Sequence, residues 1–330
     1  MDFTPLILSS LDTMRLGEMA KKESVSRFKA NVYKKAMDEI KRHGEPIRTF
    51  EEVKAIKGLG PKVVEKIREI IETGVLASAE RVKERTDVGG MTELLAIHGI
   101  GPAKARTLME SGITGIDSLR KAVAANPKLL TKAQTLGLTY AEDGAKRIPR
   151  AELVIHERTL MAGVGRGLDG TIVGSYRRGA ATSGDIDMLI RYSRDMTVAE
   201  AEKAFEAFVD GLKKSGYIVG TLASGDKKWL GYVRLGADGV VRRLDLLLTP
   251  PDEFPYAILY FTGSDVFNVA FRKHCLTLGY SLNEHTMKPV GDAAKKAVPT
   301  MDKEEDIFAF VGLKYVPPTE RVNGRQIVAV

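Results

Sequence analysis

The stretch 174–187 combines residue types that bind metal ions and phosphate groups. Within it, Asp185 and Asp187 are separated by one residue, so in a strand their carboxylates would point to the same face. Neighbouring carboxylates repel each other unless a cation lies between them, and Mg²⁺ prefers oxygen ligands. The glycines let backbone N–H groups approach a phosphate, with Arg177 or Arg178 available to pair with it. Because an Asp-x-Asp pair is also common in solvated loops, a metal site requires a third carboxylate.

Asp245 is a candidate for that third carboxylate. It lies amid apolar residues in a predicted strand over 241–248, where a lone charge is costly unless it is paired or bound to a metal. Three aspartates on neighbouring strands suit two divalent ions, one activating an attacking hydroxyl and the other holding a triphosphate. Asp245 would then accept or relay the hydroxyl proton. The sequence thus predicts phosphoryl transfer at Asp185, Asp187 and Asp245.

Composition favours an intracellular protein with a polyanionic partner. The chain has 330 residues and a formal net charge of +7, which suits nucleic acid or an anionic membrane surface. Its one cysteine, Cys275, excludes an internal disulfide framework and a multi-cysteine zinc site, and favours a reducing compartment. The sequence holds no apolar run long enough for a membrane span and no signal peptide is expected, so we expect no membrane partner.

Two glycine turns with the same pattern occur in the N-terminal half, Gly58 to Gly60 and Gly99 to Gly101. Each is followed by a proline and a helical pattern, which is the helix-hairpin-helix signature. The glycines permit a tight turn whose N–H groups face a phosphate oxygen at the start of the second helix. One copy alone would equally suit a packing turn between helices. Two copies in a basic chain favour non-specific binding to a nucleic-acid backbone.

Hydrophobic periodicity predicts helices before about residue 80 and an α+β unit after residue 150. Phe28, Val32, Ala36 and Ile40 recur at helical spacing in a segment that ends near Gly44. Further predicted helices cover 61–73, a segment after 150, 198–214 and a segment capped by Ser264 or Asp265. The predicted strands lie around 172 and over 188–191, 217–222, 228–234 and 241–248.

These motifs, in this order along nearly the whole chain, resemble the family X DNA polymerases. The segments that carry the likeness are 58–60, 99–102, 146–150, 174–187, 242–245 and 259–268. The resemblance implies four parts: a helical lyase domain with a helix-hairpin-helix over 1–81, a second helix-hairpin-helix subdomain over 82–149, a nucleotidyltransferase-type palm with a mixed sheet over 150–251, and a small α+β nucleotide-selection subdomain over 252–330.

The resemblance implies that Asp185, Asp187 and Asp245 are the ligands of two Mg²⁺ ions, for which Mn²⁺ substitutes. It also implies roles for the residues around them. The triphosphate contacts match Ser175, Arg178, Ser183 and Gly184. The segment that excludes ribonucleotides by crowding the sugar matches Tyr260, Phe261 and Gly263, although alone these aromatic residues would suit ordinary core packing. Contacts to the incoming base match Asp265 and Asn268, and contacts to the DNA strands match Lys228, Arg243 and Arg272.

In the N-terminal domain, Lys66 matches the family's lysine that forms a Schiff base with an abasic-site sugar, although alone it would suit a solvated lysine. The pocket for the 5′-phosphate of a gap matches Lys29, Tyr33 and Lys62, and Phe28 stands at a position that stacks on a template base. Monovalent cations, Na⁺ or K⁺, are implied at the two hairpin turns through the backbone carbonyls of Lys54, Ile56, Leu59, Leu95, Ile97 and Ile100.

The chain departs from the family pattern at several of these places. Val75 and Ser78 stand where relatives have lysines, so the 5′-phosphate pocket has lost charge. His285 replaces a tyrosine and Val269 replaces a lysine that packs on the template base, which bears on base selection. Ser224 and Lys227 change the basic strip near Lys228.

The expected function is a monomeric, template-directed DNA polymerase that fills gaps in base excision repair, with 5′-deoxyribose phosphate lyase activity. Its expected partners are gapped or nicked double-stranded DNA, dNTP and other base excision repair proteins, and its expected compartment is the nucleus, although mitochondrial or viral members would read alike. Template-independent nucleotidyl transfer is an alternative, against which the Tyr260-Phe261 pair and the short turn at Gly236 argue. A non-catalytic DNA-binding scaffold is a second, against which the three aspartates argue. We expect no BRCT module and no phosphoesterase domain.

Overall fold

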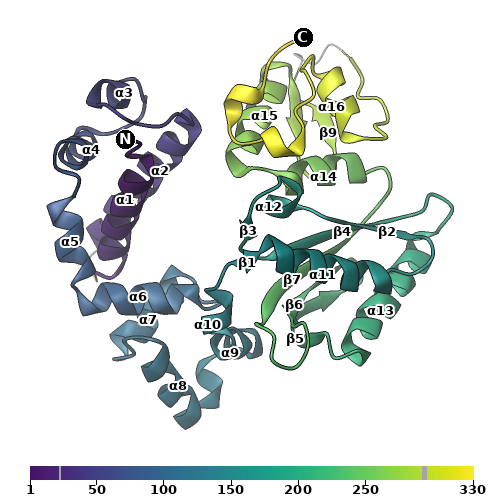
Figure 1. Cartoon of the computed structure of the whole chain (residues 1–330), viewed down its shortest axis with the longest axis horizontal. Helices are drawn as coiled ribbons and strands as arrows, with labels where there is room; N and C mark the ends of the chain where they lie inside the picture. The colour runs from purple at the N-terminus through teal and green to yellow at the C-terminus, as the bar shows by residue number, and fades with distance from the viewer. Residues whose placement is uncertain (22–23, 292–295) are drawn as a thin grey trace. The chain divides into compact units, whose positions relative to one another are not determined.

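The computed structural model describes residues 1–21, 24–291 and 296–330, which form two compact units, Met1–Ala141 and Glu142–Val330 (Figure 1). Each unit is described by itself. The first is helical and the second combines helices with a five-stranded mixed sheet, so the predicted α+β class is confirmed. None of the helices among the described residues has the length and apolar character that crossing a membrane requires.

The first unit contains two hydrophobic cores built from short amphipathic helices. The first core is formed by α1 (Thr4–Met19), α2 (Ser24–His43), α3 (Phe50–Lys54), α4 (Pro61–Thr73) and α5 (Ala77–Lys83). The second is formed by α6 (Thr86–Ala96), α7 (Pro102–Glu110), α8 (Ile116–Ala125) and α9 (Lys132–Thr139). Ala36 and Ile40 are buried as the periodicity of α2 predicts, whereas the side chain of Phe28, at the same spacing, is 72% exposed.

The two glycine turns have the conformation that the hairpin signature requires. Gly58 and Gly99 have φ angles of 90° and 80°, a region that side chains with a Cβ rarely adopt. Gly60 and Gly101 are the N-caps of α4 and α7, each followed by proline in the first turn. A Cβ at Gly60 or Gly101 would meet no atom within 4 Å, so the backbone here is open to a phosphate chain.

The second unit is built on a sheet with strand order β2-β4-β7-β6-β5. Its strands are β2 (Leu168–Ile172), β4 (Ile186–Tyr192), β5 (Ile218–Gly225), β6 (Lys228–Val233) and β7 (Arg242–Thr249). The central pair β4 and β7 is parallel and the other neighbours are antiparallel. A two-stranded ribbon, β1 (Ile148–Pro149) with β3 (Thr182–Ser183), precedes β4.

The sheet has one face covered by helices and one that carries the acidic residues. α11 (Arg150–Gly163) and α13 (Val198–Lys214) share a core with Met188, Leu244 and Leu246 (Figure 1). Because side chains alternate along a strand, Asp187 and Asp245 point to the opposite face.

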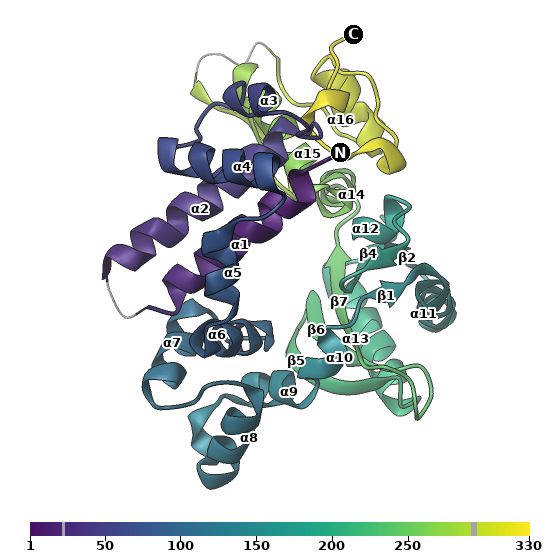
Figure 2. The same ribbon diagram turned by 60° about the vertical axis from the view of Figure 1, so that its left-hand side comes forward.

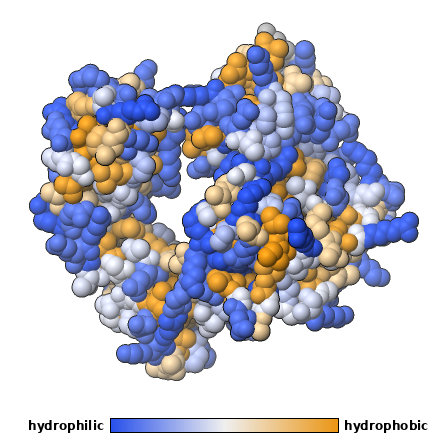
Figure 3. Space-filling view, in the orientation of Figure 1, coloured by the Kyte–Doolittle hydropathy of each residue, from blue (hydrophilic) through white to orange (hydrophobic). Residues whose placement is uncertain are grey.

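α13 has the bounds that the sequence predicts. Apolar side chains also gather on the surface over α11, where Ile155 is 51% exposed (Figure 3).

The C-terminal part of the second unit packs on the end of the sheet that carries the short helix α12 (Gly174–Arg177). It comprises α14 (Phe254–Thr262), α15 (Asp265–Thr277), β8 (Tyr280–Leu282), β9 (Met287–Pro289) and α16 (Glu304–Phe310). α12 and α14 lie side by side (Figures 1 and 2). Ser264 caps α15, as predicted, by accepting a hydrogen bond from the backbone N–H of Phe267. α14 joins the sheet to a second core, because its side chains belong to both.

His156 of α11 belongs to a buried polar cluster behind the sheet. Its Nδ1 lies 2.6 Å from the hydroxyl of Tyr217, and its Nε2 lies 3.6 Å from Glu152. The carboxylate of Glu152 accepts two hydrogen bonds from Arg242, the first residue of β7, at 2.6 and 2.7 Å. Burial lowers the pKa of His156 to about 4, against the smaller raising effect of Glu152.

We expect acidification to destabilise the fold through His156. Its pKa in the folded protein lies below the 6.5 of a free histidine, so protonation favours the unfolded chain. The stability that its neutral form provides is present above pH 6.5 and is lost as the pH falls towards 4. Between pH 7 and pH 5 this histidine should lower the free energy of unfolding by about 2 kcal/mol.

Urea unfolding followed by the fluorescence of Trp229, the single tryptophan and part of the same core, measures this loss. The variant H156N keeps a polar partner for Tyr217 but has no proton to gain. It should lack this part of the pH dependence. The same pH dependence in both proteins would contradict the assignment.

Candidate functional site

The three predicted carboxylates lie at the sheet face that α11 and α13 leave uncovered. Asp187 and Asp245 are register partners on the parallel strands β4 and β7. Asp185 lies in the bend just before β4, so it precedes the strand in which the sequence pattern placed it. Asp187 is partly buried, and among the described residues no side chain forms an ion pair with it. The sheet thus holds acidic groups near one another without neutralising all of them.

Burial raises the pKa of Asp187 to about 7, with further raising by the charges of Asp185 and Asp245. Arg243 and Lys228 oppose this shift. Arg243 is bound to Asp245 through two hydrogen bonds, of 3.1 and 2.8 Å, and this bond raises the pKa of the guanidinium. Arg243 therefore neutralises Asp245, whereas Asp187 has no ion-pair partner among the described residues.

The donor set fits a hard divalent cation. Carboxylate oxygens are the ligands that Mg²⁺ prefers, and a cation beside Asp187 would offset the burial and the neighbouring negative charges that raise its pKa. Within the described ranges, no three His, Cys, Asp or Glu side chains are gathered in the manner of metal ligands. Asp245 instead faces Arg243, so it would have to exchange this partner for a metal.

The 174–178 turn lies directly against the carboxylates. Gly174 has a φ of 63°, and a Cβ there would lie 3.3 Å from Oδ2 of Asp187. The turn is closed by a hydrogen bond of 2.8 Å from the hydroxyl of Ser175 to that of Ser183, which is buried. Glycine is therefore required here for two reasons, its positive φ and the approach of a carboxylate.

The two arginines of this turn bind the end of α14. Arg177 donates to the hydroxyl of Thr262 at 2.8 Å and to Glu304 at 2.8 Å. Arg178 donates to the backbone carbonyl of Thr262 at 2.6 Å. Arg177 thus uses NH1 and NH2 within the protein and Arg178 uses NH1, and which of the two pairs with a phosphate stays a prediction. Burial lowers the pKa of Arg178, while Asp265 raises it.

Glu304, which binds Arg177 of the 174–178 turn, is a residue that the sequence pattern did not identify. Its buried carboxylate also accepts hydrogen bonds from Arg321 at 2.8 Å and from the Tyr315 hydroxyl at 2.9 Å. The bonds to Arg177 and Arg321 lower the pKa of Glu304 against the raising effect of burial. The sequence pattern also assigned no role to Arg147 of the 146–150 motif. This arginine lies beside Gly184 and donates two hydrogen bonds to Thr182.

The residues matched to sugar and base selection lie on α14 and α15. Tyr260 and Phe261 stack edge to face with ring centroids 5.1 Å apart. Asn268 donates to the carbonyl of Tyr260 at 2.7 Å, which ties the start of α15 to the end of α14. Tyr260, Asn268 and Arg272 line one small cavity, so the structure brings these three together.

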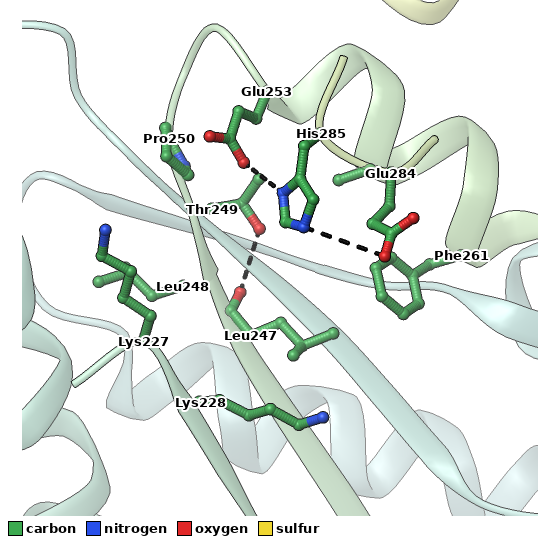
Figure 4. Close-up of a pocket in the computed structure, with 11 residues that line it drawn as sticks. Lys227, Lys228, Leu247, Leu248, Thr249, Pro250, Glu253, Phe261, Glu284 and His285 are labelled. Atoms are coloured by element: carbon green, nitrogen blue, oxygen red, sulfur yellow. Dashed lines mark hydrogen bonds and ion pairs between the residues drawn. The ribbon is translucent and has the colours of Figure 1, made fainter. Parts of the chain in front are cut away.

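Phe261 faces a larger pocket of about 380 Å³ that is also lined by Lys228 of β6 and by Lys227 of the turn before it (Figure 4). On the opposite wall, His285 lies between two carboxylates, with Nδ1 2.6 Å from Glu253 and Nε2 3.9 Å from Glu284. The pocket therefore has cations on one side and an acidic wall on the other.

In the first unit, Lys66 of α4 donates a hydrogen bond of 3.1 Å to the hydroxyl of Ser78 on α5. The same two helices are joined by Glu69, which accepts from the backbone N–H of Ala77 at 2.7 Å. Lys29 and Lys62 are exposed and Tyr33 is half-buried. The exposed ring of Phe28 is available for stacking. The carbonyl of Ile97 accepts from Ile100 at 3.0 Å, and the cation sites at the hairpins stay predictions.

Four family models match the chain in order and cover most of it. They are a helix-hairpin-helix domain over 4–76, the fingers domain of DNA polymerase lambda over 92–144, the DNA polymerase beta palm over 147–251 and the DNA polymerase beta thumb over 257–322. The chain belongs to the family X DNA polymerases. Members of this family depend on a divalent metal ion, which agrees with the donor set around Asp187.

Curated relatives of this family X chain include DNA polymerase lambda of Rattus norvegicus, 32% identical over 329 residues that cover 94% of this chain and 55% of that protein. DNA polymerase lambda of Arabidopsis thaliana is 28% identical and covers 88% and 57%. The DNA-directed DNA/RNA polymerase mu of Homo sapiens is 25% identical and covers 87% and 63%. The chain therefore spans between about half and two thirds of the length of these relatives.

We expect the metal affinity of this family X site to depend on pH through Asp187. A carboxyl with a pKa of about 7 must lose its proton before it binds a metal. Mn²⁺ binding should therefore weaken about tenfold when the pH falls from 8 to 6, and electron paramagnetic resonance with gapped DNA present measures this. D187N should bind Mn²⁺ weakly at both pH values. Equal affinity of the wild type at the two pH values would contradict the expectation.

Proposed function

We propose that the chain is a template-directed DNA polymerase that fills short gaps in base excision repair. It transfers a nucleotide from a dNTP to the 3′-hydroxyl of a primer. The observation that carries this proposal is the register pairing of Asp187 with Asp245 on parallel strands, with the 174–178 turn packed against Asp187. Acidic groups and phosphate-binding groups thus meet at one edge of the sheet, as phosphoryl transfer requires.

In this proposal Asp185, Asp187 and Asp245 hold two Mg²⁺ ions, for which Mn²⁺ substitutes. When bound, the ions would activate the primer hydroxyl and neutralise the triphosphate. Arg243 keeps Asp245 oriented before the metal is bound, as their two hydrogen bonds support. Asp245 then accepts the proton of the primer hydroxyl.

The triphosphate would be held by Ser175, Arg178, Ser183 and Gly184. Arg178 suits this role because a guanidinium has five N–H donors, and NH1 is the atom that donates to Thr262. Tyr260, Phe261 and Gly263 would crowd the sugar, and Asp265 and Asn268 would contact the incoming base. Lys228, Arg243 and Arg272 would contact the DNA strands.

The first unit would bind DNA through its two hairpins and remove the 5′-sugar phosphate. Gly58, Gly60, Gly99 and Gly101 would face the backbone, and the open space at Gly60 and Gly101 supports this. Lys66 would form the Schiff base while Lys29, Tyr33 and Lys62 hold the 5′-phosphate and Phe28 stacks on a template base. The hydrogen bond from Lys66 to the hydroxyl of Ser78 supports this role, because it holds the amine in one place.

We further propose a division of the chain at residues 81, 149 and 251, which the bounds of the matching family models support. The protein would act as a monomer in the nucleus on gapped or nicked DNA, together with other base excision repair proteins. The net charge of +7 supports a DNA partner. Na⁺ or K⁺ would occupy the two hairpin turns.

Primer extension on a single-nucleotide gap tests the polymerase. D187N should reduce incorporation on the order of a hundredfold or more, because it removes a charged metal ligand. D169N is the matched control: Asp169 also lies on the sheet, but it pairs with Arg191 at 2.9 Å. Wild-type incorporation by D187N, or an equal loss in D169N, would overturn the assignment.

Borohydride trapping on an incised abasic site tests the lyase separately. K66A should form no trapped complex, and S78A should form it several times more slowly because the amine loses its hydrogen-bonding partner. K83A is the control, since Lys83 only pairs with Glu80 on the surface of α5. Full trapping by K66A would exclude Lys66 as the nucleophile.

A further inference from the structure

Thr262 is the point at which the 174–178 turn is joined to α14. It is the last residue of that helix and is fully buried. Its hydroxyl accepts a hydrogen bond from Arg177 and its backbone carbonyl accepts one from Arg178. One residue therefore receives both arginines of the turn, through its side chain and its main chain.

These two contacts are stronger than ordinary hydrogen bonds. The last carbonyls of a helix have no partner within the helix, and a cation there also interacts favourably with the helix dipole. Both donors are charged guanidinium groups, and charge-assisted hydrogen bonds are stronger than neutral ones. Arg177 is itself held by buried Glu304, so Thr262 is attached to a fixed point.

The residues on either side of Thr262 are packed by the same contacts. Gly263 has a φ of 67°, and a Cβ there would lie 3.1 Å from NH1 of Arg178. Phe261 and Tyr260 immediately precede Thr262 and line cavities with Lys228 and with Asn268, respectively. A shift of Thr262 would therefore move both aromatic rings relative to the turn.

We propose that Thr262 is a positioning residue that fixes Tyr260 and Phe261 relative to the triphosphate, and thereby sets how strongly the enzyme rejects ribonucleotides. The inference rests on the proposed function of these residues. Arg178 can donate to Thr262 and to a phosphate at the same time, because a guanidinium has five N–H donors and the bond to Thr262 comes from NH1. The guanidinium of Arg178 would then position both the triphosphate, by direct contact, and the sugar, through Thr262 and the two aromatic rings.

The test is the ratio of kcat/KM for dCTP to that for CTP, measured on a single-nucleotide gap opposite guanine. T262V replaces the hydroxyl by a methyl group of similar size, so Arg177 keeps its bond to Glu304 but loses its bond to Thr262. It should lower the ratio about tenfold, mainly by admitting CTP. T262S keeps the hydroxyl and should stay within about threefold of the wild type.

T13V is the matched control. Thr13 of α1 is half-buried, and its hydroxyl donates to the carbonyl of Ser9 on its own helix in the first unit, so the ratio should not change. A merely structural role for Thr262 would lower the use of both nucleotides equally and leave the ratio unchanged, which would overturn the inference. An equal fall of the ratio in T13V would also overturn it.

Two further results separate this inference from the proposal on which it rests. If T262V does not fold, T262A removes the same hydroxyl without adding a methyl group beside Arg177, and the same fall of the ratio is expected. Absence of dCTP incorporation by the wild type would overturn the proposed polymerase and this inference with it. Normal dCTP incorporation with an unchanged ratio in T262A would overturn the inference alone.

Discussion

The repulsion among Asp185, Asp187 and Asp245, in a place from which water is partly excluded, is the constraint on which the catalytic half of the structure depends. Two of these carboxylates are register partners on parallel strands, so the backbone hydrogen bonds of the sheet hold them together. Arg243 compensates one of them, but Asp187 keeps a pKa near 7. Binding of a divalent ion relieves the repulsion between these carboxylates, so it lowers the free energy of the folded protein.

In the C-terminal part of the second unit, the structure depends on the buried charge of Glu304. Its buried charge is balanced by Arg177 from the edge of the sheet and by buried Arg321 from the C-terminal segment. Removing one partner of such a buried pair leaves a charge uncompensated, which costs more than the net contribution of the pair to stability. The network therefore contributes chiefly to geometry: it fixes α12, α14 and α16 relative to one another.

Local pattern was sufficient to predict the framework of the chain. The periodicity over 198–214 and the proline and glycine that bound 61–73 gave the helices with the bounds that the structure has. The position of Asp245 among apolar residues predicted a carboxylate that is paired or bound to a metal, and in the structure it pairs with Arg243. Spacing alone did not show that the ring of Phe28 lies outside the core, although it recurs with the buried residues Ala36 and Ile40 of α2. The partners of Arg177 could not be predicted, since Thr262 and Glu304 lie 85 and 127 residues away in the sequence.

The two kinds of site residue are placed by different means. The carboxylates lie on and beside central strands, where backbone pairing on both sides leaves little freedom. The groups matched to phosphate, sugar and base lie at helix ends and turns, where unpaired backbone groups and glycines allow close approach to a ligand. Such ends are less rigid than a central strand, so they need side chains to hold them. Arg177 and Arg178 meet this need at Thr262, because they belong to the turn that packs on Asp187 and so connect the helix ends to the sheet.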